Sequence, residues 1–394
     1  MKRRSISRSS FQVLLIVETS RAYGRGIVEG VSKYAFEQGN WFIHFQDRGL
    51  VEMLPEPLSR WRGDGIITRT ATEKLHRLIL AKNLPYVELF GSGMPEILCD
   101  EKMVGRMAAE HFIERGLKNF AYFAIGCPWW SKWRGECFER GLHCFGFSPI
   151  HFRQKHPKRS PLPIWDTAHD EELLDWLKNL PKPIGIFCAA DIHAITILEY
   201  CRRLNIAVPE EVAVLGTDND EMLCNVANPK ISSIELDSSR IGYLAADLLH
   251  RRILGTAKKI ATPILVPPLF VETRQSTDMI AIEDQDVAQA IRFIREKACS
   301  SITVADVARH VELSQATLFR RFRHHLGHSP EREIIRVRID RAKKLLLETG
   351  FPLSVIASKT GFLPTEYFIR VFKRECGVTP NRFRTISGID GEGR

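Results

Sequence analysis

An internal repeat in the last hundred residues constrains the fold more than any other feature of the sequence. SQATLFRRFRHHLGHSP (314–330) aligns without gaps with PTEYFIRVFKRECGVTP (364–380), fifty residues later. Both copies have apolar residues four positions apart and then a glycine: Leu318, Phe322 and Gly327 in the first, Phe368, Phe372 and Gly377 in the second. This spacing is typical of a helix that buries one face and ends at a glycine. The repeat therefore predicts two equivalent amphipathic helices.

Each copy follows a short helical pattern and a tight turn, at 303–314 and at 353–364. A short helix, a turn and a second helix make a helix-turn-helix motif, so the sequence predicts this motif twice. The segment PEREIIRVRIDRAKKLLLE (330–348) carries one apolar stripe. It predicts a long helix that joins the two motifs and fixes the distance between them.

The net charge lies in the same part of the chain. Residues 285–386 hold 19 basic and 10 acidic side chains, which accounts for the whole formal charge of +9. A basic module beside a neutral one suggests a polyanion as the partner of that module alone. Double-stranded DNA, read as operator half-sites, is the expected partner. For the charge alone the alternative is a solvated basic surface, and for the module it is a helical bundle for protein contacts.

The second helix of each motif presents hydroxyls, amides and cations, which hydrogen-bond to base edges and phosphates. In the second motif Lys373 and Arg374 are expected to face phosphate and the other candidates to face bases. The predicted DNA-binding residues are Ser314, Gln315, Thr317, Arg320 and Arg321 in the first motif and Thr365, Glu366, Ile369, Arg370, Lys373 and Arg374 in the second.

The region from residue 11 to residue 255 alternates between short apolar runs and amphipathic helical patterns. The apolar runs read as buried parallel strands, at 13–18, 65–68, 86–90, 120–125, 185–190 and 212–218. This alternation predicts parallel sheets covered by helices on both faces, in two lobes. The predicted organisation is a basic tail (1–10), an α/β two-lobe sensor (11–279), a linker (280–288), an all-α domain with two helix-turn-helix motifs (289–386) and a C-terminal tail (387–394).

Two of the predicted strands end on polar residues. GIFCAAD ends at Asp191, and VAVLGTDND ends at Asp218 and Asn219. Ligands of open α/β sheets collect beyond the carboxyl ends of the strands, so we expect these residues to contact a ligand. For Asp191 the alternative is a cap on the following helix.

The remaining composition narrows the class of protein. The nine cysteines include no CxxC pair, which favours reduced thiols over disulfides or a metal site, and no cofactor is expected. No apolar run is long enough to span a membrane, and the run after the basic opening is too short for a signal peptide. The sequence predicts a cytoplasmic protein. It contains no P-loop, nucleophile elbow or HExxH motif, so an enzyme is not expected, although Asp191 and Asp218 could form an acid/base pair.

Residues 291–386 resemble the DNA-binding domain of the AraC family of transcription regulators. The resemblance lies in the pattern IA…GF…YF…FK…G.TP..FR, which begins at Ile356 and ends at Arg384. It implies a transcription regulator whose two motifs both contact DNA.

The N-terminal region resembles the sugar-binding core of LacI/GalR regulators and periplasmic binding proteins. The matching stretches are GIVEGVSKYA (26–35), WRGDGII (61–67), LGTDND (215–220) and ISSIELDSSRIGYLAADLL (231–249). The resemblance implies a sugar between two lobes and gives Arg134 the place of a hydroxyl-binding arginine. Arg25 is a second candidate donor with Tyr23 beside it, and Trp130 could stack on the sugar or pack between lobes.

A sensor of this kind joined to an AraC-type reader resembles the activators of pentose operons. That resemblance, rather than any spacing of residues, implies D-xylose as the effector. We expect a homodimer that binds paired half-sites and, if it activates, contacts RNA polymerase. A repressor that releases DNA when it binds sugar is the alternative.

Overall fold

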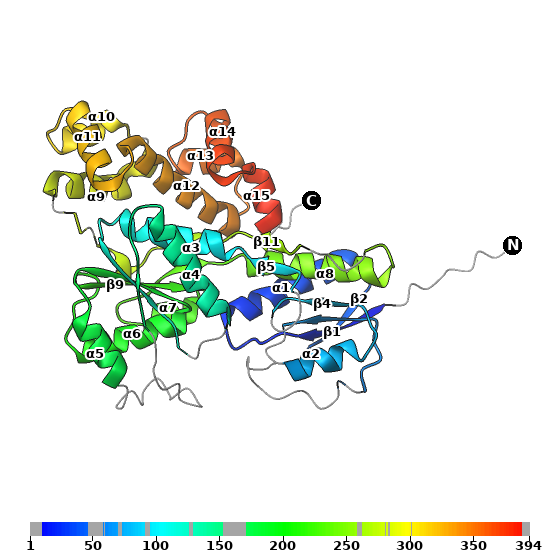
Figure 1. The fold of residues 1–394 in the computed structure, drawn as a ribbon. Coiled ribbons are helices and arrows are strands. Elements are labelled where there is room, and N and C mark those ends of the chain that lie inside the picture. The colour runs from blue at the N-terminus through cyan, green and yellow to red at the C-terminus, as the bar shows by residue number, and fades with distance from the viewer. Residues whose placement is uncertain are drawn as a thin grey trace. The chain divides into compact units, whose positions relative to one another are not determined.

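The structure is a computed structural model of the 394-residue chain. It describes residues 10–45, 58, 60–69, 73–90, 95–125, 129–152, 171–257, 262–279, 281–282, 284–300 and 302–387. The predicted tails lie almost wholly outside these residues. The chain divides into two compact units, residues 1–100 with 236–268, and residues 101–235 with 269–394 (Figure 1). The predicted sensor is therefore shared between both units, and the second unit also contains the helical domain.

The first unit is built on a parallel sheet of four strands in the order β2-β1-β3-β4. Helices α1 and α8 pack against each other closely, because a Cβ on Gly242 would lie 2.1 Å from the carbonyl oxygen of Ile27. The elements of this unit are β1 (Phe11–Ile16), α1 (Ala22–Gln38), β2 (Trp41–Phe45), β3 (Gly65–Thr68), α2 (Glu73–Leu80), β4 (Tyr86–Glu88), β5 (Ile97–Cys99), α8 (Ser238–Ile253) and β11 (Ile264–Val266).

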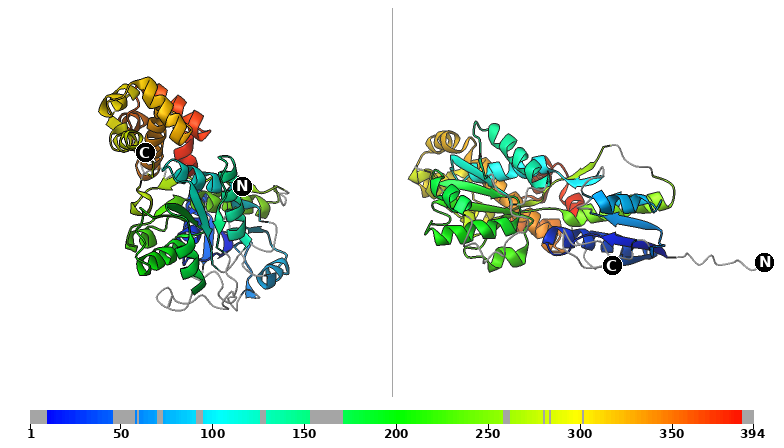
Figure 2. Two further views of the ribbon diagram at one scale, coloured as in Figure 1. Left: turned by 60° about the vertical axis from the view of Figure 1, so that its left-hand side comes forward. Right: turned by 60° about the horizontal axis from the view of Figure 1, so that its bottom comes forward.

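The second unit contains a sheet of six strands in the order β12-β10-β9-β8-β6-β7, in which only β12 runs antiparallel to its neighbour. The central strands β8 and β9 are buried along their whole length, and helices cover both faces of the sheet (Figure 2). The elements are α3 (Glu101–Ile113), β6 (Asn119–Phe123), α4 (Trp129–His143), β7 (Ile150–His151), α5 (Glu171–Asn179), β8 (Ile184–Cys188), α6 (Asp191–Arg203), β9 (Val212–Thr217), α7 (Glu221–Val226), β10 (Ser232–Glu235), β12 (Phe270–Glu272) and the 3-10 turn η2 (Gln275–Thr277).

The helical domain consists of two three-helix groups on one long helix. α9 (Gln285–Lys297), α10 (Val304–His310) and α11 (Gln315–Leu326) surround one end of α12 (Pro330–Glu348). α13 (Leu353–Lys359), α14 (Thr365–Cys376) and α15 (Pro380–Ser387) surround the other end (Figure 1). Each group has its own apolar core.

The repeat is confirmed in detail. The two recognition helices, α11 and α14, end at Gly327 and Gly377, and both glycines have the left-handed backbone at φ 74°. Phe322 and Phe372 are fully buried at equivalent positions. The predicted connecting helix 330–348 coincides with α12, because Ser329 caps its start and proline suits its first position.

One boundary differs from its prediction. Helix α9 begins at Gln285, within the segment predicted as linker (280–288). The reason is a cap: the side chain of Asp284 accepts hydrogen bonds from the backbone amides of Asp286 (3.1 Å) and Val287 (3.2 Å). Among the described residues, no helix combines the length and apolar character that crossing a membrane requires.

Candidate functional site

The carboxyl ends of β8, β9 and β10 meet at one edge of the six-stranded sheet. Asp191, which follows β8, is hydrogen-bonded to residues in β10 and after β9. Its side chain is only 1% exposed. One carboxylate oxygen accepts from the Ser233 hydroxyl (2.5 Å) and the other from the backbone amide of Asp220 (2.7 Å). Burial, and next the neighbouring Asp218, raise the pKa of Asp191 well above its usual value.

Asp191 does not cap its helix. It is the first residue of α6, and the N-cap position belongs to Ala190, which makes no side-chain cap hydrogen bond. The carboxylate instead crosses to β9 and β10, which is possible because Gly216 leaves room: a Cβ there would lie 2.1 Å from a carboxylate oxygen of Asp191. Asp191 therefore fixes the positions of Ser233 and of the Asp220 backbone at the strand-end site.

Asp218 and Asn219 are half-buried at this edge and form a turn with positive φ angles of 98° and 46°. The Asn219 amide nitrogen donates to a carboxylate oxygen of Glu235 at 2.7 Å, and its backbone amide donates to the Ser233 hydroxyl at 3.0 Å. The Asn219 side-chain oxygen is buried and has no hydrogen-bond partner among the residues that the structure describes. A buried acceptor without a partner is costly unless a ligand donates to it.

Arg134 and Trp130 lie together on α4. The Arg134 side chain is 4% exposed and forms a two-pronged ion pair with Glu101, with both N–O distances at 2.7 Å. It also donates to the carbonyl oxygen of Ala189 at 2.6 Å. Its guanidinium lies over the Trp130 ring, 5.2 Å from the centroid. The indole nitrogen of Trp130 is buried, and no hydrogen-bond partner for it lies in the described part of the chain. Arg134 thus joins α4, the start of α3 and the end of β8.

Tyr23 and Arg25 belong to the first unit, at the start of α1. The Arg25 side chain is exposed and donates to the carbonyl oxygen of Thr19 at 3.1 Å. Tyr23 lies beside Arg69, whose guanidinium is 4.8 Å from its ring centroid, and Arg69 forms an ion pair with the buried Glu18. The strand ends of this unit therefore provide a second set of aromatic and charged groups.

The sequence interpretation missed four charged residues near the strand ends, of which three contact predicted residues and the fourth, Glu18, contacts Arg69. They are Glu101, Glu235, Glu18 and Arg69. Arg69 directly follows β3, Glu235 ends β10, and Glu18 lies two residues after the end of β1. The position directly after the predicted strand 65–68 is a usable signal for Arg69, and the polar end of the predicted strand 13–18 is one for Glu18.

The recognition helices display most of their predicted residues. Those with exposed side chains are Ser314, Gln315, Arg320, Glu366, Arg370, Lys373 and Arg374. The Ser314 hydroxyl also caps α11, where it accepts from the Thr317 backbone amide (3.1 Å) and donates to the Thr317 hydroxyl (2.9 Å). Thr317 and Thr365 are half-buried.

Two predicted DNA contacts turn toward the protein. Arg321 lies 3.1 Å from a carboxylate oxygen of Asp284 and 2.8 Å from one of Asp286, at the start of α9. Ile369 is half-buried and packs against the core of the second helical group. Both side chains therefore hold a recognition helix in place within this structure.

Known proteins match this chain over nearly its whole length. Residues 109–277 match a periplasmic binding protein-like domain, and residues 307–386 match a helix-turn-helix domain. The xylose operon regulatory protein of Haemophilus influenzae is 32% identical, with 95% of this chain and 98% of that protein covered. The protein of the same name from Escherichia coli K12 is 29% identical, with 95% and 97% covered.

Solved structures agree. A structure described as the xylose-binding transcription activator xylR aligns with a TM-score of 0.59 at 28% identity, covering 97% of this chain and 99% of that one. The Lac repressor dimer bound to operator aligns with 69% of this chain at a TM-score of 0.54 and 18% identity, which shows the sensor fold alone.

Proposed function

This chain belongs to the family of the xylose operon regulatory proteins, and from that premise we propose that D-xylose is its effector and that it activates genes of xylose catabolism. Family members are transcription regulators and not enzymes. The names of the relatives support D-xylose, and the chemistry of the strand-end site supports a sugar.

The observation that carries the sugar assignment is the Asn219 side chain. Its nitrogen donates to Glu235, while its oxygen is a buried acceptor to which none of the described residues donates. A sugar hydroxyl can donate a hydrogen bond to such an oxygen and can also accept one from a neighbouring donor. A hydrocarbon can do neither, and a fully ionised anion has no proton to donate. Asp218 beside it adds a further acceptor, and the Trp130 ring offers an apolar surface for the C–H face.

An enzymatic role for the Asp191 and Asp218 pair has no support in this geometry. A general acid or base must exchange protons with a substrate. Both oxygens of Asp191 are already occupied by hydrogen bonds from Ser233 and Asp220, and the residue is buried. Asp191 positions the site, and the site binds without turnover.

We assign DNA contact to the exposed faces of α11 and α14. The side chains that we expect at bases are Gln315, Arg320, Glu366 and Arg370, with Lys373 and Arg374 at phosphates. Two recognition helices on one α12 can enter successive major grooves, about 34 Å apart along the duplex. Because cations at phosphates release counterions, the affinity should fall steeply with salt.

The proposal extends to assembly and output. A homodimer would place four recognition helices on paired half-sites in the cytoplasm, and sugar-bound protein would contact RNA polymerase. A reporter gene read with and without D-xylose separates activation from sugar-released repression. Expression that rises only when both the protein and D-xylose are present supports activation, whereas expression that is high without the protein indicates repression.

Titration calorimetry on the purified full-length chain tests the effector. D-xylose should bind saturably, and L-arabinose, D-ribose and D-glucose should bind at least tenfold more weakly. D-xylose should also change the affinity for operator DNA. Saturable binding of another sugar in place of D-xylose would correct the effector, and binding of none would refute the assignment of a sugar sensor.

A further inference from the structure

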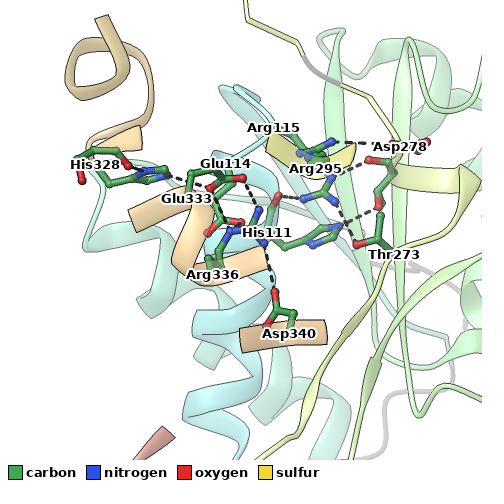
Figure 3. Close-up of polar contacts among 12 residues, drawn as sticks. His111, Glu114, Arg115, Thr273, Asp278, Arg295, His328, Glu333, Arg336 and Asp340 are labelled. Atoms are coloured by element: carbon green, nitrogen blue, oxygen red, sulfur yellow. Dashed lines mark hydrogen bonds and ion pairs between the residues drawn. The ribbon is translucent and has the colours of Figure 1, made fainter. Parts of the chain in front are cut away.

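The carboxyl-terminal end of α3 meets α12 in a cluster of charged side chains that the sugar and DNA sites do not use (Figure 3). Glu114 and Arg115 follow α3, which belongs to the sensor part of the second unit. Glu333, Arg336 and Asp340 lie on α12, the helix that carries both helix-turn-helix motifs. The cluster therefore joins the sensor to the reader.

Arg336 is the centre of this cluster. Its Nε lies 3.2 Å from a carboxylate oxygen of Glu114 across the junction. On its own helix it pairs with Glu333 at 2.5 Å and with Asp340 at 3.4 Å. The Glu333 side chain is 2% exposed and that of Glu114 is 15% exposed. In such surroundings Coulomb attraction is screened much less than at a free surface.

The two residues after Glu114 hold the backbone at the end of α3 in place. The Arg115 guanidinium donates to the carbonyl oxygens of Thr277 (2.7 Å) and His111 (2.8 Å), and the Arg115 carbonyl oxygen accepts from the backbone amide of Ala281 (2.6 Å). Gly116 has φ 79°, and a Cβ there would lie 2.4 Å from Ile282. These contacts fix the orientation of the C-terminal end of α3 and, with it, the position of Glu114.

A chain of hydrogen bonds connects this corner with the strand-end site. The Thr277 hydroxyl donates to the Ser232 hydroxyl (2.7 Å) on β10, so His111, 2.9 Å away, must be the donor to Thr277. Burial lowers the pKa of His111 well below its usual value, which keeps it neutral. The next residue on β10 is Ser233, which binds both Asp191 and the Asn219 backbone.

A second contact fixes α12 further along. Lys344 pairs with Glu272 on β12 at 2.9 Å and 3.0 Å, and Lys343 donates to the carbonyl oxygen of Leu269 at 3.1 Å. These contacts lie two turns beyond Arg336, so α12 is held at two separate points. Glu114, Glu333 and His328 also have the spacing of metal ligands, but Arg336 already supplies the positive charge between the two carboxylates.

We propose that the Glu114–Arg336 contact is a latch that makes α12 follow the sensor lobe, so that sugar binding at the strand ends changes how the two recognition helices are presented. This inference rests on the proposed function, and it adds the place where the signal passes. A ligand shifts an equilibrium only through groups that differ between its states, and this latch is one of the two points at which such a difference can reach α12.

The test uses full-length Glu114→Gln, which keeps the shape of the side chain and removes its ionisable carboxyl, and Glu114→Gln with Lys344→Ala, which also removes the Lys344–Glu272 ion pair. Glu110→Gln is the matched control, because Glu110 lies one turn earlier on α3 and pairs with Arg106 on the same helix. For each protein, D-xylose affinity and operator affinity with and without sugar are measured.

We expect D-xylose affinity within twofold of wild type for all variants. The ratio of operator affinities with and without sugar should fall at least fivefold in Glu114→Gln, further in the double variant, and not in the control. Variants that keep the wild-type ratio would overturn the latch. A wild-type protein with no sugar dependence would instead overturn the proposed function.

Hydrogen exchange on the wild-type chain gives a readout that depends on no variant. D-xylose should change exchange at the strand ends near residues 217–220 and also in α12 near residues 333–340. A change confined to the strand ends, with α12 unaffected, would also contradict the latch.

Discussion

Arg321 on the first recognition helix lies 3.1 Å from Asp284, the residue that caps α9. The same carboxylate thus caps α9 and forms an ion pair with α11, and Asp286 adds a second contact to Arg321 at 2.8 Å. Arg320, its neighbour in sequence, is exposed. Two adjacent arginines on one recognition helix consequently have different surroundings, and their replacement should have different effects.

We predict that Arg321→Ala lowers the free energy of unfolding by about 0.5–1 kcal/mol, since a partly exposed ion pair contributes that much. The salt dependence of operator binding should hardly change. Arg320→Ala should leave stability within about 0.5 kcal/mol, weaken operator binding about tenfold and relax the preference for the base pair that it contacts. Urea unfolding, binding across a salt series and binding to operators with single base changes check both variants, and a reversal of the two outcomes would place Arg321 at the DNA.

Asn219→Ala should weaken D-xylose binding by at least tenfold, because it removes the acceptor that we assign to a sugar hydroxyl and frees Glu235 from its partner. The loss of one such hydrogen bond in a buried site costs about 1–3 kcal/mol. Asn225→Ala is the matched control, since Asn225 is exposed on α7. Calorimetry measures both, and equal affinities for the two variants would remove Asn219 from the site.

Much of the fold followed from local patterns in the sequence. The repeat located α11, α12 and α14, because helix periodicity and terminal glycines are local signals. The buried strands β8 and β9 were found as continuous apolar runs. Strands such as β2, β7 and β10 were missed, because short or partly polar strands depend on their neighbours in the sheet.

The candidate sites were predicted less completely than the fold. Asp191, Asp218 and Asn219 do share one sheet edge, as their positions after parallel strands implied. The inward direction of Arg321 depends on Asp284, 37 residues earlier, and the Glu114–Arg336 contact joins residues more than two hundred positions apart. Such pairings follow from the tertiary arrangement, so no spacing in the sequence could indicate them.

From the raised pKa of the Glu114 carboxyl we predict that the stability of the protein depends on pH. Burial, opposed in part by Arg336, raises its pKa from an ordinary 4.5 to about 7. Between these values the folded state holds a proton that the unfolded chain has released, so this group makes stability fall as pH rises from about 5 to about 7. His111, which burial keeps neutral in the folded state, has the opposite effect on stability below pH 6.5. Wild type and a Glu114 variant share this contribution of His111, so the difference between their stabilities reports on Glu114.

In Glu114→Gln the contribution from this proton is gone. The free energy of unfolding of the variant, minus that of wild type, should therefore rise with pH across this window, by up to about 1.4 kcal/mol per pH unit. Urea unfolding of both proteins at pH 5, 6 and 7 measures the difference. A difference that stays constant with pH would mean that Glu114 is ionised throughout.

Gly216 offers the last prediction, because the strand-end site depends on its missing side chain. A Cβ there would lie 2.1 Å from a carboxylate oxygen of Asp191, and that carboxylate is fixed by Ser233 and Asp220. Gly216→Ala should therefore displace Asp191, lower the free energy of unfolding by about 1–3 kcal/mol and weaken D-xylose binding. In the matched control, Gly350→Ala, the added Cβ meets nothing within 4 Å, so thermal unfolding and sugar affinity should stay at wild-type values. If Gly216→Ala matched this control in both measurements, Asp191 would not be the residue that shapes the site.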